Sequence, residues 1–170
     1  MHRQGSRELV ARELTQGERG TWATRSPLAF GAAMVGLMFG LKVLTIPLIL
    51  AAGGADTTGP VLDRGLWLVF VAFAILPVET CLGQWLPIWL LGKLGVRTWF
   101  ALCAWSGAFF GVLHLGSGLG GWAVGFTSGA VLSHCWLSWR AKSLGTAFWF
   151  TTAVHAVHNA LAFLLYIASR

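Results

Sequence analysis

The stretch "TAFWFTTAVHAVHNALAFLLYIA" (residues 146–168) places two histidines and an asparagine inside a largely apolar run. It contains no aspartate, glutamate, lysine or arginine, and its length meets the roughly 20 residues that an α-helix needs to cross a bilayer. Polar groups are costly in hydrocarbon, so His155, His158 and Asn159 are candidates for a functional role. The stretch therefore predicts a transmembrane helix with a polar site along it.

The whole sequence has the composition of a polytopic membrane protein. Of its 170 residues, 56% are hydrophobic and 11% are charged, whereas a soluble domain carries about 25% charged residues. Apolar segments near 28–52, 65–92, 98–116 and 121–139 precede the one at 146–168. Only helices satisfy their own backbone hydrogen bonds in lipid, so we expect an all-α bundle of about five transmembrane helices.

Basic residues predict the orientation of this bundle. Nine lysines and arginines lie in the N-terminal tail and in the loops after the second and fourth spans, against two on the opposite side. The positive-inside rule then places the N-terminus inside and the C-terminus outside. We expect residues 1–27 to form a polar cytoplasmic tail and residues 28–168 a single transmembrane domain, in a bacterial cytoplasmic membrane. Lys42 falls within the first span, where it would snorkel to the surface or face a polar cavity.

Glycine and proline predict how the helices pack and bend. Glycines at four-residue spacing let helix backbones approach closely; they are Gly36 and Gly40, Gly107 and Gly111, Gly116 and Gly120, and Gly121, Gly125 and Gly129. We expect Pro77 and Pro87 to kink the second span, because proline lacks the N–H that a helical hydrogen bond needs. Three single cysteines without CxxC spacing indicate neither a disulfide framework nor a zinc knuckle.

Three spans carry candidate catalytic side chains at membrane depth. Glu79, in the second span, is the last acidic residue of the sequence, and His114 lies near the end of the third. His155 and Asn159 are four residues apart in the fifth, so they share one helix face. A carboxylate with a histidine can deprotonate water, and a histidine with an amide can donate hydrogen bonds to an oxyanion. The set suffices for metal-free amide hydrolysis, although composition alone does not choose this over a proton relay.

Three short stretches carry a resemblance to a known family. "ETCLGQ" (79–84), "FGVLH" (110–114) and "HAVHN" (155–159) resemble the EExxxR, FxxxH and HxxxN motifs of the CPBP intramembrane proteases, which include CAAX proteases and bacteriocin-processing or immunity proteins. The resemblance covers about residues 65–168. It implies a glutamic-type endopeptidase without metal or cofactor. Its substrate would be a membrane-associated or C-terminally anchored protein or peptide.

The resemblance also implies roles for individual residues. Glu79 would be the general base and His114 would help it to activate water. His155 and Asn159 would form the oxyanion hole. Phe110 would pack one turn from His114 as a supporting residue.

The first motif departs from the family pattern. Thr80 replaces its second glutamate and Gln84 its arginine, so both members of a charge pair are neutral here. We expect His158 to lie outside the catalytic set, bonded to another helix. For Glu79 and His114 to meet at one depth, we expect the glycine-rich turn at 115–121 to be re-entrant.

Other functions are compatible with the same residues. A non-catalytic CPBP-like immunity or binding protein would keep the fold without cleaving, and the altered first motif favours it. A proton-coupled carrier or a haem protein would use the same histidines, but the sequence shows no internal repeat and no obvious axial pair. A zinc protease is disfavoured because no HExxH occurs. The expected partners are a membrane-anchored substrate and the bilayer, not nucleic acid, and the oligomeric state stays open.

Overall fold

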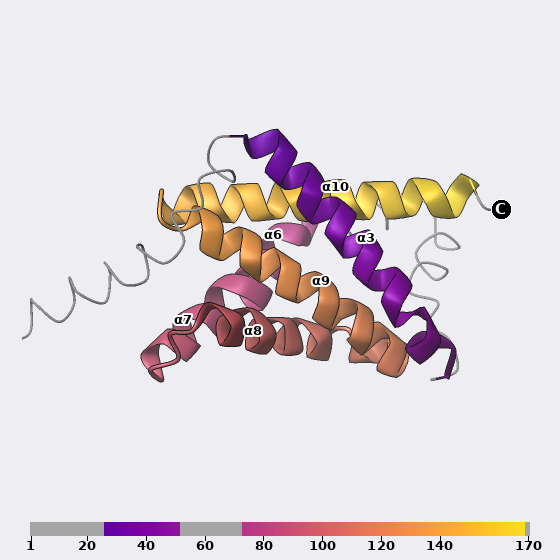
Figure 1. The fold of residues 1–170 in the computed structure, drawn as a ribbon, viewed down its shortest axis with the longest axis horizontal. Helices are drawn as coiled ribbons and strands as arrows, with labels where there is room; N and C mark the ends of the chain where they lie inside the picture. Colours follow the sequence, from indigo (N-terminus) through magenta and orange to yellow (C-terminus); the bar gives the residue numbers. More distant parts are fainter. Residues whose placement is uncertain (1–25, 52–72, 169–170) are drawn as a thin grey trace, which may run out of the picture.

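Residues 26–51 and 73–168 are described by the computed structural model, and within these ranges every regular element is a helix. The elements are α3 (Pro27–Ala51), α6 (Leu76–Thr80), the π-helical η1 (Cys81–Trp85), α7 (Leu86–Lys93), α8 (Trp99–Leu113), the 3₁₀ turn η2 (Leu115–Ser117), α9 (Gly118–Trp139) and α10 (Leu144–Ala168) (Figure 1). The all-helical prediction is confirmed for this part. The predicted N-terminal tail and residues 65–72 of the second span lie outside the described residues.

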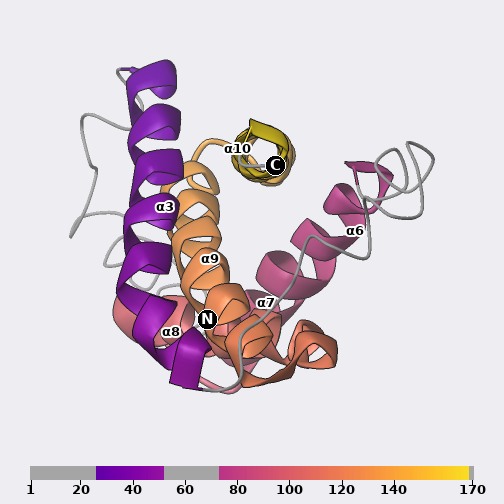
Figure 2. The same cartoon turned by 90° about the vertical axis from the view of Figure 1, so that its right-hand side faces the viewer.

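Helix α9 lies at the centre of the bundle and contacts α8, α3 and α10. Figure 1 shows it running between α8 and α10, and Figure 2 shows α10 end-on, with α3 on one side and α6 on the other. Leu132 and Cys135 of α9 are fully buried in a hydrophobic core that also includes Met38 of α3 and Leu102 of α8. The core therefore joins helices that are far apart in the sequence.

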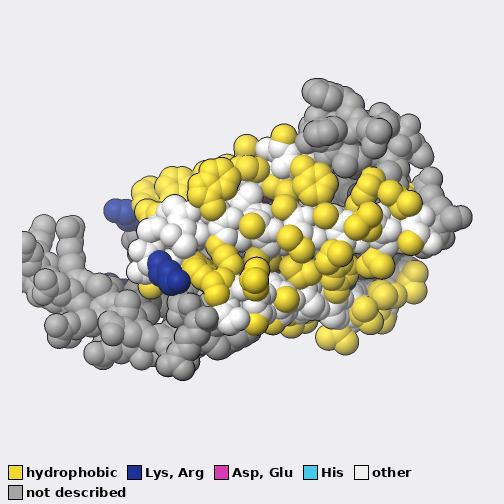
Figure 3. All heavy atoms as spheres, turned by 90° about the horizontal axis from the view of Figure 1, so that it is seen from above, with side chains coloured by type: hydrophobic (Ala, Val, Ile, Leu, Met, Phe, Trp, Pro, Cys, Tyr) yellow, Lys and Arg dark blue, Asp and Glu magenta, His cyan; other side chains and the backbone are white. Residues whose placement is uncertain are grey.

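Two described helices are long and apolar enough to cross a membrane, Pro27–Pro47 and Leu144–Ala168. The segments Trp99–Leu113 and Leu115–Trp139 meet the same test as a pair, with a bend of 61° between them, so there are up to three such spans in the described part. Large hydrophobic side chains cover the face in Figure 3, and lysine or arginine appears at one end of it. An apolar surface of this extent fits contact with lipid.

The second predicted span departs from α-helical geometry next to both of its prolines. A turn at Ile75 precedes Pro77, and the π-helical η1 precedes Pro87. Short π segments inside α-helices are rare, and those that occur are often found at functional sites. Here η1 begins two residues after Glu79.

A serine pair compensates for the hydrogen bond that Pro87 cannot make. In a regular helix the N–H of residue 87 would bond to the carbonyl of Gly83, and proline has no N–H to offer. The hydroxyl of Ser106 on α8 donates to that carbonyl instead. The hydroxyl of Ser133 on α9 lies 2.8 Å from Ser106 Oγ and can donate to it. These fully buried serines thus fix η1 against two neighbouring helices.

The predicted glycine packing is confirmed between α8 and α9. A Cβ at Gly107 would lie 2.8 Å from the carbonyl oxygen of Phe126, and one at Gly125 would lie 2.9 Å from Cα of Gly111. The same prediction is wrong for α3, because a Cβ at Gly36 or Gly40 meets no described atom within 4 Å. The four-residue spacing is therefore used where α8 and α9 cross.

Replacing Gly107 with alanine should destabilise the bundle by about 1–3 kcal/mol, the usual cost of overpacking. The atoms that a new Cβ would meet include the backbone of Phe126 and Ala130, which cannot move without separating the helices. The measurement is denaturant unfolding in detergent micelles, with Gly40→Ala as the matched control. We expect the control to be neutral or slightly stabilising, since alanine is the better helix former. Equal stability of the two variants would contradict the packing argument.

Candidate active site

Glu79 lies on the short helix α6 and is the one acidic residue within the described ranges. Helix α6 has proline near its first turn, where the missing N–H costs no helical hydrogen bond. Leu76 and Thr80 are its buried residues, and the Glu79 side chain is 27% exposed. Glu79 thus sits at the margin of the protein interior and keeps limited access from outside.

His155 of α10 faces Glu79. Its Nε2 lies 3.8 Å from Oε2 of Glu79, and its side chain is 5% exposed. This separation is longer than a direct hydrogen bond of about 2.7–3.2 Å. The other ring nitrogen, Nδ1, is buried and has no hydrogen-bond partner among the described residues. A carboxylate and an imidazole from helices far apart in the sequence therefore meet in the interior.

His114 follows the last residue of α8 and belongs to the same cluster. Its Nδ1 lies 2.9 Å from the carbonyl oxygen of Phe110. A carbonyl can only accept, so Nδ1 carries the proton and Nε2 presents a lone pair. The ring of Phe110 contacts this imidazole and that of His155. His114 thus adds a hydrogen-bond acceptor to the cluster.

Phe110 packs against both histidines. Its ring centroid lies 4.7 Å from that of His114 and 5.7 Å from that of His155. The predicted contact of Phe110 with His114 is confirmed. The space for this ring depends on Gly83 of η1 and Gly129 of α9, where any Cβ would collide with it. Phe110 is therefore the packing centre of the candidate site.

The end of α9 next to His114 is also built from glycine. A Cβ at Gly121 would lie 2.5 Å from the carbonyl oxygen of His114, and one at Gly125 would lie 3.1 Å from its Cβ and Cγ. These two glycines let α9 pass against the residue that ends α8. The predicted turn at 115–121 is shorter in the structure: η2 ends at Ser117 and α9 begins at Gly118. The residues of η2 are exposed.

Asn159 is held by its neighbour His158. Nδ1 of His158 lies 3.1 Å from Oδ1 of Asn159. An amide oxygen only accepts, so the imidazole donates, and the Nδ2 side of the amide is left for another acceptor. Among the described residues, the expected bond from His158 to another helix is not observed: its contact with α3 is a ring contact with Phe39 at 4.8 Å, and its buried Nε2 has no partner there. His158 thus positions the amide from the same helix.

Lys42 of α3 is partly buried. Its position within an apolar segment fits snorkelling and a polar cavity equally well.

The two altered positions of the first motif are both fully buried. Thr80 accepts a hydrogen bond from the hydroxyl of Thr152 on α10, at 3.1 Å. Both side-chain amide atoms of Gln84 lack a hydrogen-bond partner in the described part. Thr80 therefore links α6 by a hydrogen bond to α10, the helix that carries His155. Gln84 is an unpaired polar group next to the site, of the kind that buried water normally satisfies.

The structure brings Glu79, His114, His155 and Phe110 together, and places Asn159 one turn further along α10. No three histidine, cysteine, aspartate or glutamate side chains gather into a metal-binding group within the described ranges. Sequence reasoning missed Ser106. The missing N–H of Pro87 signals that some donor is needed at Gly83, but it does not say which.

Comparison of the chain with protein-family models, with characterised proteins and with solved structures finds no match.

Proposed function

We propose that this chain is a metal-independent, glutamic-type intramembrane endopeptidase acting on a membrane-associated or C-terminally anchored protein. The observation that carries the proposal is the approach of Glu79 to His155, 3.8 Å apart in a largely apolar bundle. An ionisable residue at membrane depth is expensive and usually marks a site of function. His114, which contacts the same Phe110 ring as His155, adds the third group that hydrolysis needs.

In this proposal Glu79 takes a proton from a water molecule that also donates to Nε2 of His114. The resulting hydroxide attacks the carbonyl carbon of the scissile peptide bond. His155 and the Nδ2 group of Asn159 donate hydrogen bonds to the oxyanion that forms. The proton held by Glu79 then passes to the leaving amine nitrogen, and the two peptide products separate.

The low polarity of the surroundings strengthens this arrangement. Preorganised donors stabilise a developing oxyanion more strongly in a water-poor site than in solution. We propose five spans with the N-terminus inside and the C-terminus outside, in a bacterial cytoplasmic membrane, because nine lysines and arginines of the tail and loops then lie inside and two outside. The substrate would then reach Glu79 from within the bilayer.

A non-catalytic protein with the same fold is the second candidate. The unpaired amide of Gln84 favours it, since the resembling family carries an arginine there. Without that arginine, Glu79 could be held as a structural partner of His155. This alternative predicts no turnover of any peptide bond.

The test is hydrolysis in ¹⁸O-labelled water. The full chain is reconstituted in liposomes with membrane-anchored candidate substrates, and the products are analysed by mass spectrometry. We expect one ¹⁸O atom in each new C-terminal carboxylate and no loss of rate with EDTA or phenanthroline. Inhibition that is reversed by added zinc would overturn the metal-independent mechanism.

A further inference from the structure

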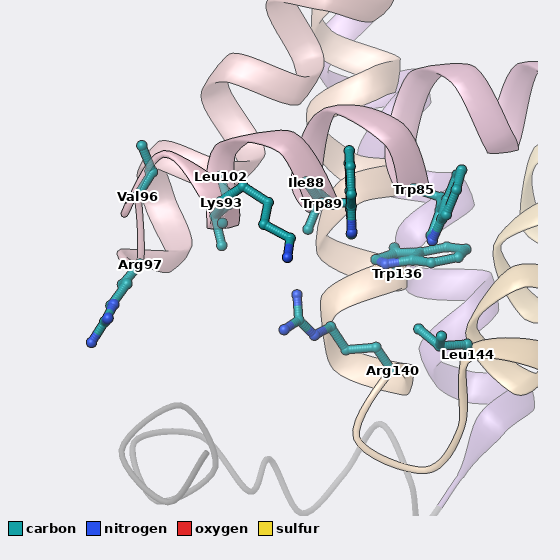
Figure 4. Close-up of a pocket in the computed structure, with 11 residues that line it drawn as sticks. Trp85, Ile88, Trp89, Lys93, Val96, Arg97, Leu102, Trp136, Arg140 and Leu144 are labelled. Carbon is teal, nitrogen blue, oxygen red and sulfur yellow. The ribbon is translucent and has the colours of Figure 1, made fainter. Parts of the chain in front are cut away.

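A cavity separate from the candidate active site lies near the loops that follow α7 and α9. Its volume is about 390 Å³, within the roughly 300–1,000 Å³ range of small-molecule sites. The lining comes from α7, the connection to α8, α8 itself, the end of α9 and the start of α10. It comprises Trp85, Ile88, Trp89, Gly92, Lys93, Val96, Arg97, Leu102, Trp136, Arg140 and Leu144 (Figure 4).

Two cationic groups converge on this cavity. Figure 4 shows the Lys93 ammonium and the Arg140 guanidinium turned toward the same space, one from the end of α7 and the other from the end of α9, whereas Arg97 points away. None of the described residues that line it is acidic. Like charges that converge repel each other unless an anion lies between them, so the pair is suited to bind one.

The rest of the lining is aromatic and apolar. The Trp85 and Trp89 rings stack with centroids 6.3 Å apart, and the two residues are 38% and 50% exposed. Lys93 Nζ lies 5.8 Å from the centroid of the Trp89 ring, a cation–π contact. Buried Ile88 and Leu102 complete the inner wall. The cavity thus combines a cationic end with an apolar wall that opens outward.

We propose that this cavity binds an anionic glycerophospholipid, with its phosphate between Lys93 and Arg140 and an acyl chain along Trp85 and Trp89. Half-exposed tryptophans are typical of the membrane–water interface. The lysines and arginines of these loops mark the predicted cytoplasmic side, where anionic lipids attract basic residues. Basic pockets between transmembrane helices on that side are suited to lipid headgroups. The proposal does not depend on the protease activity of the candidate site.

Binding of phosphatidylglycerol to the delipidated full-length protein in neutral detergent tests the proposal. Native mass spectrometry would give the affinity, with phosphatidylcholine and inorganic phosphate as comparison ligands. We expect the double variant Lys93→Gln, Arg140→Gln to lose about thirtyfold in affinity for phosphatidylglycerol, since each basic residue near an anionic lipid contributes roughly fivefold. Lys142→Gln is the matched control, because that ammonium lies over the Trp139 ring and does not line the cavity.

A second measurement follows the acyl chain and does not require the cationic variant to fold. Phosphatidylglycerol brominated on its acyl chain should quench tryptophan fluorescence at one lipid per protein. Trp85→Phe with Trp89→Phe should remove most of this quenching, and Trp105→Phe, an exposed position on α8, should not. Equal quenching in the two variants would overturn the placement of the chain.

Three results would each overturn the lipid proposal. Phosphatidylcholine could bind as tightly as phosphatidylglycerol, which would leave the cations without a role. Millimolar inorganic phosphate could displace the lipid completely, which would make this a free-anion site. Lipid could bind only after the acidic residues of the N-terminal segment, Glu8, Glu13 and Glu18, are replaced by glutamine. That result would mean that this segment, and not a lipid, occupies the cavity.

Discussion

The Glu79→Gln variant is expected to lose peptide hydrolysis by at least about a hundredfold, the lower end of what a general base contributes. Glutamine keeps the size and shape of the side chain but cannot accept a proton from water at neutral pH. No other acidic residue lies within the described ranges to take over the role. The loss should therefore appear in kcat with little change in KM, because the acid–base step comes after substrate binding.

The measurement is the cleavage rate of a substrate that the wild-type chain processes, in liposomes at matched protein content. Thr127→Val is the matched control, because that hydroxyl bonds to carbonyls of its own helix and lies outside the site. Both variants should unfold within a few degrees of the wild type. If Glu79→Gln still cleaves at more than a third of the wild-type rate, Glu79 is structural and the proposed mechanism fails.

The sequence predicts the composition of this site better than its geometry. Residue spacing along the helices explains why His155 and Asn159 share a face of α10, and the motif resemblance selects Glu79 and His114. That these groups meet follows from packing between helices, which no local pattern encodes. The sequence predicts a bond from His158 to another helix, but His158 bonds to the amide of Asn159. The spacing along one helix does not show which side-chain rotamer the neighbouring helices allow.

The sequence also does not show which distant side chain supplies a hydrogen bond that the local helix cannot make. The carbonyl of Gly83 needs a donor because Pro87 has none, and this need is visible in the sequence. Ser106, which supplies the donor, lies on α8, and the sequence does not show that α8 packs against this carbonyl.

Phe110 is the residue through which packing and chemistry are most strongly coupled. It is 1% exposed, lies against the rings of His114 and His155, and fills space left by glycines on two other helices. The Phe110→Ala variant should lose about 3–5 kcal/mol of unfolding free energy, the usual cost of truncating a buried phenylalanine. Since the ring also packs against both imidazoles, we expect cleavage to be lost even where the variant remains folded.

Phe110→Leu separates the two effects. Leucine refills most of the space, so its stability loss should be less than half of that of Phe110→Ala. It restores no aromatic contact with either histidine, and such contacts contribute roughly 0.5–1.5 kcal/mol beyond burial. Unfolding in detergent gives the stability, and the cleavage rate below the unfolding transition gives the activity. Wild-type activity in Phe110→Leu would show that volume alone positions the imidazoles, whereas wild-type stability in Phe110→Ala would contradict its central place in the core.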